Sequence, residues 1–215
     1  MRDETISDFL DRLATGPRPA TGRGRVPAPG AGASAALHAA QAGALLALVA
    51  RYSTGEKYAA HQVMVDRIIR EADALRGRAL TLAEQDGAAF TALADAHRLP
   101  EDPEQATTVR SAAIARALVG AARPSAEVIA VALDALELAE ALLPIGNPSV
   151  ITDVAAAAEA ARAAATTARV NVEANLTGIR DERARGALLA DTARVDEISA
   201  RAEQVTAAVR AELAK

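Results

Sequence analysis

Asp86 is the residue of this chain whose position most directly suggests chemistry. It falls between Leu82 and Phe90 on an apolar stripe that recurs at helical spacing from Val65 to Leu93. A carboxylate on such a stripe faces the core, and burying it is costly unless a partner holds it. Two interpretations stay open: Asp86 is tied to a structural partner, or it is retained as a functional acid.

A glycine-rich turn precedes the first long helical segment. Residues 30–35 read Gly-Ala-Gly-Ala-Ser-Ala, which superficially fits the dinucleotide fingerprint G-x-G-x-x-A. That fingerprint requires a strand before it, and Pro27 and Pro29 argue against one. What remains is a helix N-terminus, whose free backbone N–H groups can meet an anion or a carbonyl oxygen. A plain linker explains the same residues equally well.

Basic residues occur at two further places. Lys57 and Tyr58 follow a Ser-Thr-Gly turn and put a cation and a phenol at a helix junction, although a solvated lysine is the more ordinary explanation. Arg18, Arg23 and Arg25 form a small cluster in a loop rich in proline and glycine. These arginines are explained by solvation alone, but they could also steer a polyanion.

Polar side chains mark both ends of a later alanine stripe. Asp153, Asn171 and Asn175 share one face of a predicted helix, because the 18 residues from Asp153 to Asn171 make five whole turns. Those two residues lie about 27 Å apart along the axis, so they cannot serve one small site within one chain. Either one end is structural, with the asparagines making ordinary interhelical hydrogen bonds, or a dimer brings ends of different subunits together.

The composition predicts that helices position all of these residues. Hydrophobic residues make up 51% of the 215 but aromatic residues only 2%, so the apolar content is aliphatic and largely alanine, which favours helices over strands. There is no cysteine, and the three histidines lack metal-ligand spacing, so we expect no metal site. The net charge of -4 argues against nucleic-acid binding.

The order of these patterns predicts one all-α domain over residues 1–215, a multihelical bundle of long antiparallel helices. Proline, glycine and capping signals place helices near 5–15, 33–52, 59–98, 104–143 with an interruption near Pro124, 147–178 and 181–215, with a loop before the second. Because alanine buries little area, we expect a homodimer.

A stretch from Val26 to Ala50 carries no charge and is long enough to span a bilayer. It is rich in alanine and contains His38 and Gln41, so we predict a helix buried in protein and no membrane association. The acidic residues near the N-terminus argue against an export signal, which leads us to expect a cytoplasmic protein.

Taken in order, the segments resemble the cyclodeaminase/cyclohydrolase family of folate enzymes, which includes methenyltetrahydrofolate cyclohydrolase and the cyclodeaminase part of formiminotransferase-cyclodeaminase. The resemblance rests on the order and spacing of several segments: "TISDFLDRLA", "PAPGAGASAALHAAQAGALLALVA", "STGEKY", "DGAAFTAL", the "LP" stop and "GNPSVITDVAAAAEAARAAATTARVNVEANLTGIRD". They cover most of the chain.

The resemblance implies a dimeric enzyme that acts on one-carbon tetrahydrofolates near a subunit interface, with no cofactor besides its folate substrate. The implied reaction is hydrolysis of 5,10-methenyltetrahydrofolate to the 10-formyl compound, or the cyclodeaminase reaction with loss of ammonia. A site of this kind needs a carboxylate near the cationic carbon, a proton-transfer group and hydrogen-bond donors for the developing oxyanion.

The same resemblance suggests a role for each candidate residue. Asp86 would stabilise the cation or act as base, Lys57 would transfer a proton or orient the water, and Asp153 with Asn147 would hold the pterin or its partner loop. The residues expected to bind substrate are Gly30, Gly32, Ser34, Tyr58, Asn147 and Arg25, with Arg18 or Arg23 as further candidates for attracting the glutamate tail.

The chain departs from the family pattern at several positions. Ala31 replaces the middle glycine of the family loop, Ala33 replaces its serine, and Ser149 stands where an asparagine is expected. The loop before Gly30 is also longer, carrying "ATGRGR". If alanine blocks a close backbone approach, the alternative is a catalytically impaired helical dimer that serves as a binding or scaffold protein.

Overall fold

The computed structural model describes residues 4–16, 18–19, 25–26, 29–100 and 104–215. In this part of the chain almost every residue lies in a helix, which confirms the predicted all-α class. The elements in chain order are α1 (Ile6–Thr15), β1 (Arg18–Pro19), β2 (Arg25–Val26), α2 (Ala31–Tyr52), the 3₁₀ turn η1 (Glu56–His61), α3 (Gln62–His97), α4 (Glu104–Leu142), the 3₁₀ turn η2 (Pro148–Val150), α5 (Thr152–Leu176), α6 (Glu182–Ala193) and α7 (Val195–Leu213).

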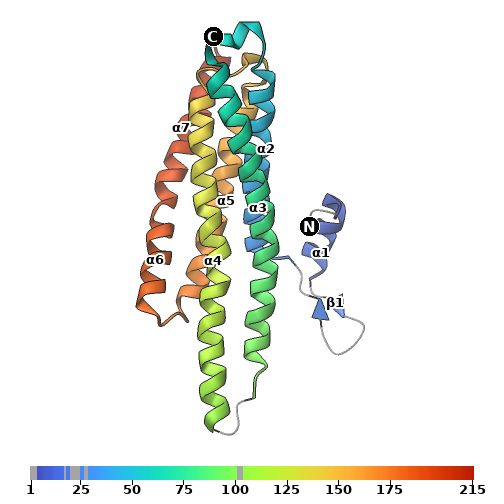
Figure 1. Ribbon diagram of the computed structural model, residues 1–215, viewed down its shortest axis with the longest axis vertical. Coiled ribbons are helices and arrows are strands. Elements are labelled where there is room, and N and C mark those ends of the chain that lie inside the picture. Colours follow the sequence, from blue (N-terminus) through green and yellow to red (C-terminus); the bar gives the residue numbers. More distant parts are fainter. Residues whose placement is uncertain (1–3, 17, 20–24, 27–28, 101–103) are drawn as a thin grey trace.

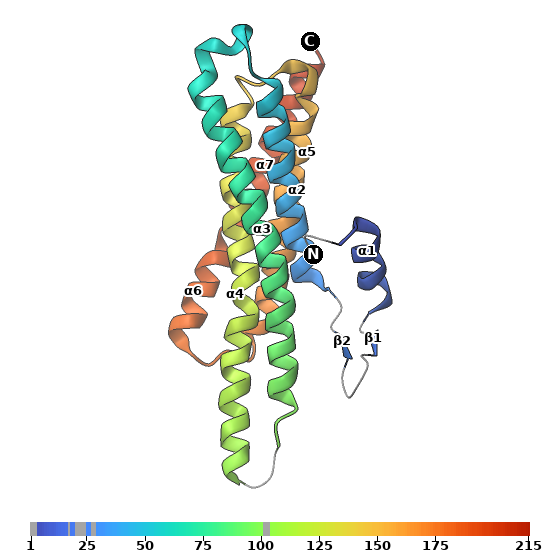
Figure 2. The ribbon, with the colours of Figure 1, turned by 45° about the vertical axis from the view of Figure 1, so that its right-hand side comes forward.

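The long helices form an antiparallel bundle, as predicted (Figure 1). α2 packs against α3, α4 and α5, so it lies at the centre, and α7 packs along α5. α3 and α4 extend well beyond the other helices at one end, while α1 and the β1–β2 pair lie to one side of α2 (Figure 2). The first turn of α2 therefore meets the middle of α3 rather than its end.

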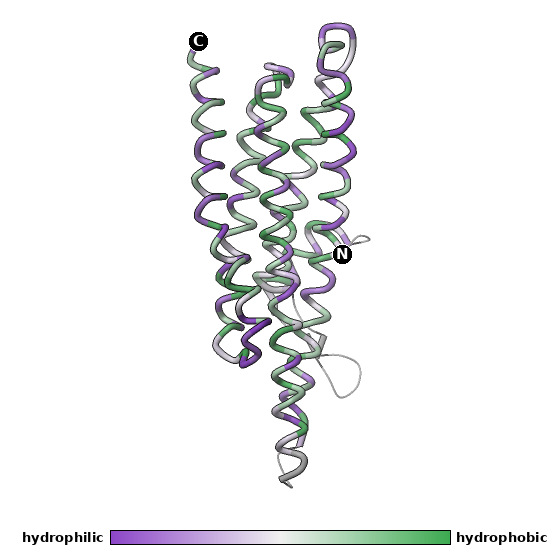
Figure 3. The backbone as a smooth tube through the Cα atoms, turned by 60° about the vertical axis from the view of Figure 1, so that its left-hand side comes forward, coloured by the Kyte–Doolittle hydropathy of each residue, from purple (hydrophilic) through white to green (hydrophobic). Residues whose placement is uncertain are grey.

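α2 and α3 approach closely because small residues line their contact. Ala35, Ala39 and Ala42 have no exposed surface, and a Cβ on Gly43 would stand 2.9 Å from the carbonyl oxygen of Ala72. α2 is long and apolar enough to cross a membrane by length and composition, yet most of its apolar window is buried inside the bundle. In Figure 3 hydrophobic colour is concentrated in the inner helices.

Local sequence signals set several helix ends. The Thr5 hydroxyl accepts a hydrogen bond of 3.1 Å from the Asp8 N–H at the start of α1, and Gly16 ends that helix with a positive φ of 69°. At η2 the Asn147 side chain accepts from the Ser149 N–H at 3.0 Å, so the predicted polar cap before Pro148 is confirmed. Asp181 caps α6 in the same way.

Three local predictions were wrong. α4 continues through Pro124 because one proline removes a single helical hydrogen bond, whereas the flanking turns stay packed against α3 and α5. The C-terminal segment is two helices that meet at Arg194, since α6 packs on α4 and α7 packs along α5. The predicted loop contains the short antiparallel pair β1–β2, in which Arg18 opposes Val26 and Pro19 opposes Arg25.

Candidate functional site

Asp86 lies on α3 in a pocket of about 440 Å³ beside the N-terminus of α2. The turn before α2 and the helices α3, α4 and α5 all contribute to its walls. The lining residues are Pro29, Gly30, Ala31, Gly32, Asp86, Gly87, Phe90, Leu93, Ala121, Asn171, Ala174 and Asn175. Among these described residues, Asp86 carries the single ionisable side chain, so it supplies the charge of the pocket.

The Asp86 carboxylate lies directly against the first turn of α2. A Cβ on Gly32 would overlap its Oδ1, so glycine is required for this approach. The carboxylate accepts a hydrogen bond from the backbone N–H of Ala33. Donors in the first turn of a helix have no partner within the helix, and the helix dipole adds positive potential there. The glycine turn thus holds a protein carboxylate at the helix N-terminus.

Two further helices contribute polar groups to the same cluster. Asn171 on α5 donates from Nδ2 to Ser125 Oγ on α4 at 2.8 Å, and its side chain also hydrogen-bonds Asp86. Asn175 donates from Nδ2 to the Asn171 carbonyl oxygen at 2.8 Å. The predicted interhelical role of Asn171 is therefore confirmed. Ser125 was not predicted as a site residue, since serine in a long helix gives no signal of its own.

The surroundings of Asp86 shift its titration. Burial raises the pKa of the carboxyl above its ordinary value, and the hydrogen bonds from the Ala33 N–H and the Asn171 side chain lower it, with burial the larger effect. A raised pKa brings a carboxylate closer to neutral pH, where it can both take up and release a proton. The pocket is therefore suited to proton transfer next to a positively charged ligand.

Phe90 was predicted to face the core, and this prediction was wrong. Its side chain is 59% exposed and lines the pocket one helical turn after Asp86. The reason lies in the packing of the two helices. α2 covers the apolar stripe of α3 only as far as its own N-terminus, which lies beside Asp86, and α3 continues beyond that point (Figure 2). An exposed aromatic ring in a pocket offers a flat apolar face to a planar ligand.

Four of the predicted site residues lie at the opposite end of α2: Lys57, Tyr58, Asn147 and Asp153. Asn147 binds the end of that helix, because its Nδ2 donates to the Tyr52 carbonyl oxygen at 2.9 Å and its N–H donates to Ser53 Oγ at 2.8 Å. Tyr52 follows Gly32 by 20 residues, which corresponds to about 30 Å along the helix. A single chain therefore does not bring these four residues to Asp86.

Within that second group the side chains differ in exposure. Lys57 is exposed in η1, and its ammonium lies 5.4 Å from the centroid of the Tyr58 ring. Asp153 is half-buried in the first turn of α5. The group thus offers a cation, a phenol and a carboxylate at one end of the bundle.

The remaining predicted binding residues belong to the glycine turn and to the preceding loop. Gly30 and Gly32 line the pocket, while Ser34 is half-buried and its N–H bonds the Gly30 carbonyl oxygen at 3.0 Å. Arg25 lies in β2, but its side chain falls outside the described part of the chain, as does that of Arg18, and Arg23 lies outside it altogether.

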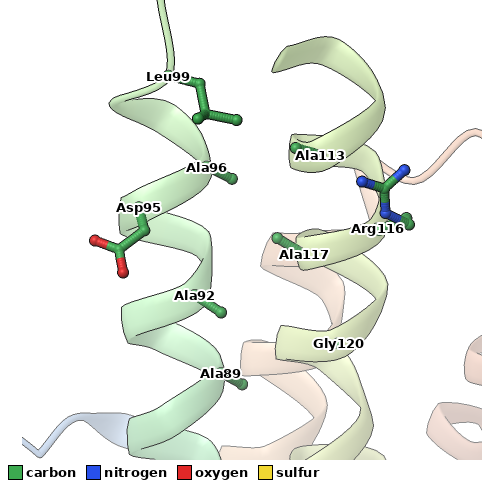
Figure 4. A pocket seen from close by; sticks show the side chains of 9 residues that line it. All are labelled: Ala89, Ala92, Asp95, Ala96, Leu99, Ala113, Arg116, Ala117 and Gly120. Carbon is green, nitrogen blue, oxygen red and sulfur yellow. The ribbon is translucent and has the colours of Figure 1, made fainter. Parts of the chain in front are cut away.

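A larger hollow of about 480 Å³ lies between the extended parts of α3 and α4 (Figure 4). Its floor is formed by alanines, and Asp95 and Arg116 stand on the outer sides of the two helices in the close-up. This hollow offers no inward polar group for chemistry. Across the described residues, no group of three histidine, aspartate or glutamate side chains is placed to hold a metal ion.

The sequence profile of the family described as formiminotransferase-cyclodeaminase matches residues 5–194. The chain belongs to this family. A methenyltetrahydrofolate cyclohydrolase of Methylorubrum extorquens is 31% identical over 180 residues, which are 83% of this chain and 82% of that protein. The crystal structure of a formiminotetrahydrofolate cyclodeaminase from Thermotoga maritima matches with a TM-score of 0.83 and 26% identity, over 99% of this chain and 98% of the other. The resemblance inferred from the sequence is confirmed.

The two alanines that depart from the family's loop do not obstruct the pocket of this formiminotransferase-cyclodeaminase family member. Ala31 is exposed at the pocket wall. Ala33 is buried and contributes its backbone N–H to Asp86, which any residue except proline could do. The position where a Cβ would displace Asp86 is Gly32, and there the glycine is present.

Proposed function

We propose that this protein is a one-carbon folate enzyme that hydrolyses 5,10-methenyltetrahydrofolate to 10-formyltetrahydrofolate in the cytoplasm, without a cofactor. The observation that carries the proposal is the Asp86 carboxylate, held against Gly32 in a pocket whose described lining has no other charge. The pocket of about 440 Å³ has the size of a small-molecule site. The name of the Methylorubrum extorquens relative supports hydrolysis as the reaction.

The charge of the substrate explains why the pocket holds a carboxylate. In 5,10-methenyltetrahydrofolate the bridging carbon is part of an amidinium cation. A carboxylate about 4 Å from a cation attracts it by about 4 kcal/mol at an effective dielectric constant of 20. Phe90 presents an exposed aromatic face beside Asp86, against which the planar pterin can pack.

Asp86 can serve both proton transfers of the hydrolysis. Water attacks the bridging carbon, and Asp86 accepts one of its protons, which gives a neutral adduct with a hydroxyl on that carbon. The bond from this carbon to N5 then breaks, N5 takes the proton from Asp86, and the hydroxyl loses its proton as the formyl C=O forms on N10. One water is consumed and one proton is released, which balances the loss of the cationic charge.

A homodimer would complete this site. The exposed face of α2 contains Ala31, Gln41, Ala44, Leu48 and Tyr52, and the one exposed charge on this helix, Arg51, is paired with Asp73 on α3. Gln41 is eleven residues from Gly30 and eleven from Tyr52. If two copies of α2 pack antiparallel about a two-fold axis at Gln41, Gly30 of one copy lies opposite Tyr52 of the other.

Such a dimer brings the two groups of predicted residues together. Lys57 and Asn147 lie just beyond Tyr52 and would approach the Asp86 pocket of the neighbouring copy. Lys57 would then orient the attacking water or relay a proton. Mixing an inactive Asp86→Asn protein with an inactive Lys57→Met protein should restore about a quarter of wild-type activity, because about half of the dimers are mixed and each has one intact site. No recovery on mixing would contradict the shared site.

The decisive test of the function is the decay of methenyltetrahydrofolate absorbance with the purified protein. We expect acceleration by the wild type and a fall of at least about a hundredfold for Asp86→Asn, since the base is lost while the shape is kept. Wild-type turnover by Asp86→Asn would remove Asp86 from the mechanism.

The cyclodeaminase reaction is the second candidate, supported by the Thermotoga maritima structure of that name. There N10 attacks the formimino carbon and ammonia leaves, so Asp86 would act as a proton donor to the departing nitrogen. Formiminotetrahydrofolate assayed in parallel separates the two reactions. Acceleration of neither would favour a binding or scaffold dimer of the same fold.

A further inference from the structure

We propose that Ser125 is a positioning residue for Asp86 and acts through the side-chain amide of Asn171. The proposal rests on the function given above, because it concerns the acid assigned to catalysis. The three residues come from three helices: Ser125 from α4, Asn171 from α5 and Asp86 from α3. Their side chains converge beside the first turn of α2.

The hydrogen bond from Asn171 to Ser125 orients the amide. An asparagine side chain has two N–H donors on Nδ2 and an acceptor on Oδ1, and rotation of the terminal amide exchanges the two ends. Because Nδ2 donates to Ser125 Oγ at 2.8 Å, the donor end is held in the cluster, where it also meets the carboxylate. Without the serine oxygen, the amide loses the contact that keeps Oδ1, a second acceptor, away from Asp86.

Packing alone does not explain a serine at position 125. It has no exposed surface, and the hydrogen bond with Asn171 is the one that its hydroxyl makes in the described structure. The buried neighbours Ala122 and Ala126 show that alanine fills this part of α4. Alanine also has the higher helix propensity, so the hydroxyl is accounted for by its contact with Asn171.

Among the described residues, no other charged side chain lines the pocket beside Asp86. The charged or titratable side chains nearest in sequence to the pocket are His38 on α2, Glu84 on α3, Arg123 and Glu127 on α4, and Arg169 and Glu173 on α5; none of them lines the pocket. Within the described part of the chain, the groups that hydrogen-bond the Asp86 carboxylate are the Ala33 N–H at the start of α2 and the Asn171 amide.

The test combines kinetics with a measurement that needs no substrate. Ser125→Ala should lower kcat at pH 7 about tenfold with KM nearly unchanged, the size expected for one hydrogen bond to a charged group. It should move the acidic limb of the kcat profile to higher pH, because a lost donor disfavours the ionised carboxylate. In the free protein, the ¹³Cγ resonance of Asp86, assigned by its absence in Asp86→Asn, should titrate at higher pH than in the wild type.

Matched variants separate positioning from general damage. Ser125→Thr keeps the hydroxyl and should stay within about twofold of the wild type. Thr192→Val removes another buried hydroxyl, on α6 away from the pocket, and should move neither kcat nor the Asp86 titration. Asn171→Leu removes the amide itself and should shift the titration further than Ser125→Ala, which gives a second measure if one variant folds poorly.

The outcomes are distinguishable. An unchanged Asp86 resonance and unchanged kcat in Ser125→Ala would overturn the proposal, as would a shift in Asn171→Leu alone. If the wild type turns over neither folate, the proposed function fails, while the NMR titration still decides whether Ser125 controls Asp86.

Discussion

Substituting alanine for Gly32 tests the central contact of the pocket. The new Cβ would overlap the Asp86 carboxylate and stand 2.8 Å from Asn171 Nδ2. The side chain of Asp86 is the more mobile partner, so we expect it to rotate away from α2. That movement breaks its hydrogen bonds with the Ala33 N–H and with Asn171.

Stability and catalysis should fall by different amounts in Gly32→Ala. Hydrogen bonds to a charged group contribute about 1.5–3 kcal/mol each, but the displaced carboxylate regains water in the open pocket. We therefore expect the free energy of unfolding to fall by only about 1–2 kcal/mol. Catalysis should fall by about a hundredfold, because a displacement of about 1 Å from the productive geometry has that effect.

Two other glycines, Gly43 on α2 and Gly77 on α3, provide controls. Gly43→Ala places a Cβ 2.9 Å from the Ala72 carbonyl oxygen, so it should cost about 1–3 kcal/mol of stability while the folded protein keeps its kcat. Gly77→Ala meets nothing within 4 Å and should stabilise α3 by about 0.5–1 kcal/mol. Melting curves and methenyltetrahydrofolate turnover would be measured for all three variants. Wild-type kcat in Gly32→Ala would refute the argument.

Further predictions concern charge, stacking and helix docking. Because burial raises the pKa of Asp86, this carboxyl holds a proton more readily in the folded protein than in the unfolded chain. The free energy of unfolding therefore falls as the pH rises from about 4 through the raised pKa. Asp86→Asn should melt at a higher temperature than the wild type at pH 7.5, and the two melting temperatures should converge below pH 4. Phe90→Ala should leave the melting temperature nearly unchanged, since the ring is 59% exposed. It should raise KM about tenfold, whereas Phe90→Tyr should keep a KM near that of the wild type. Equal KM values for the wild type and Phe90→Ala would exclude stacking of the substrate on this ring. Arg201→Met should lower the free energy of unfolding by about 1 kcal/mol, because two hydrogen bonds of 2.7 and 2.8 Å from Arg201 to Glu140 connect α7 to α4. Loss of the exposed Lys215 side chain should lower it by almost nothing. Equal melting temperatures for the two variants would contradict this prediction.

The fold was largely predictable because its determinants are local or periodic. The alanine content, the uncharged stretch now seen as α2 and the capping residues Thr5 and Asn147 each act within a few residues of where they stand. Three local predictions failed: a helix break at Pro124, one continuous C-terminal helix across Arg194, and a loop without strands where β1 and β2 pair. At Pro124 and at Arg194, packing against neighbouring helices decides whether the helix continues. α4 stays helical through the proline because it packs on α3 and α5, and the last segment divides because α6 packs on α4 and α7 packs on α5.

The candidate site was predictable only in part. Asp86 and Gly32 carried signals, a charge on an apolar stripe and a glycine at a helix start, and the structure places them in contact. Phe90 looked like a core residue because the sequence does not say where α2 stops covering α3. Ser125 carried no signal, since its meaning comes from Asn171, 46 residues away.

Helix propensity and hydrophobic periodicity are properties of neighbouring residues, so they sufficed to predict that the chain is helical, which helix faces are apolar and that Asp86 places a charge on an apolar face. The contacts of the Asp86 carboxylate on α3 with the N-terminus of α2 and with the Asn171 amide on α5 could not be predicted in this way. Those contacts depend on the axial offset between helices, and close packing of small side chains sets that offset.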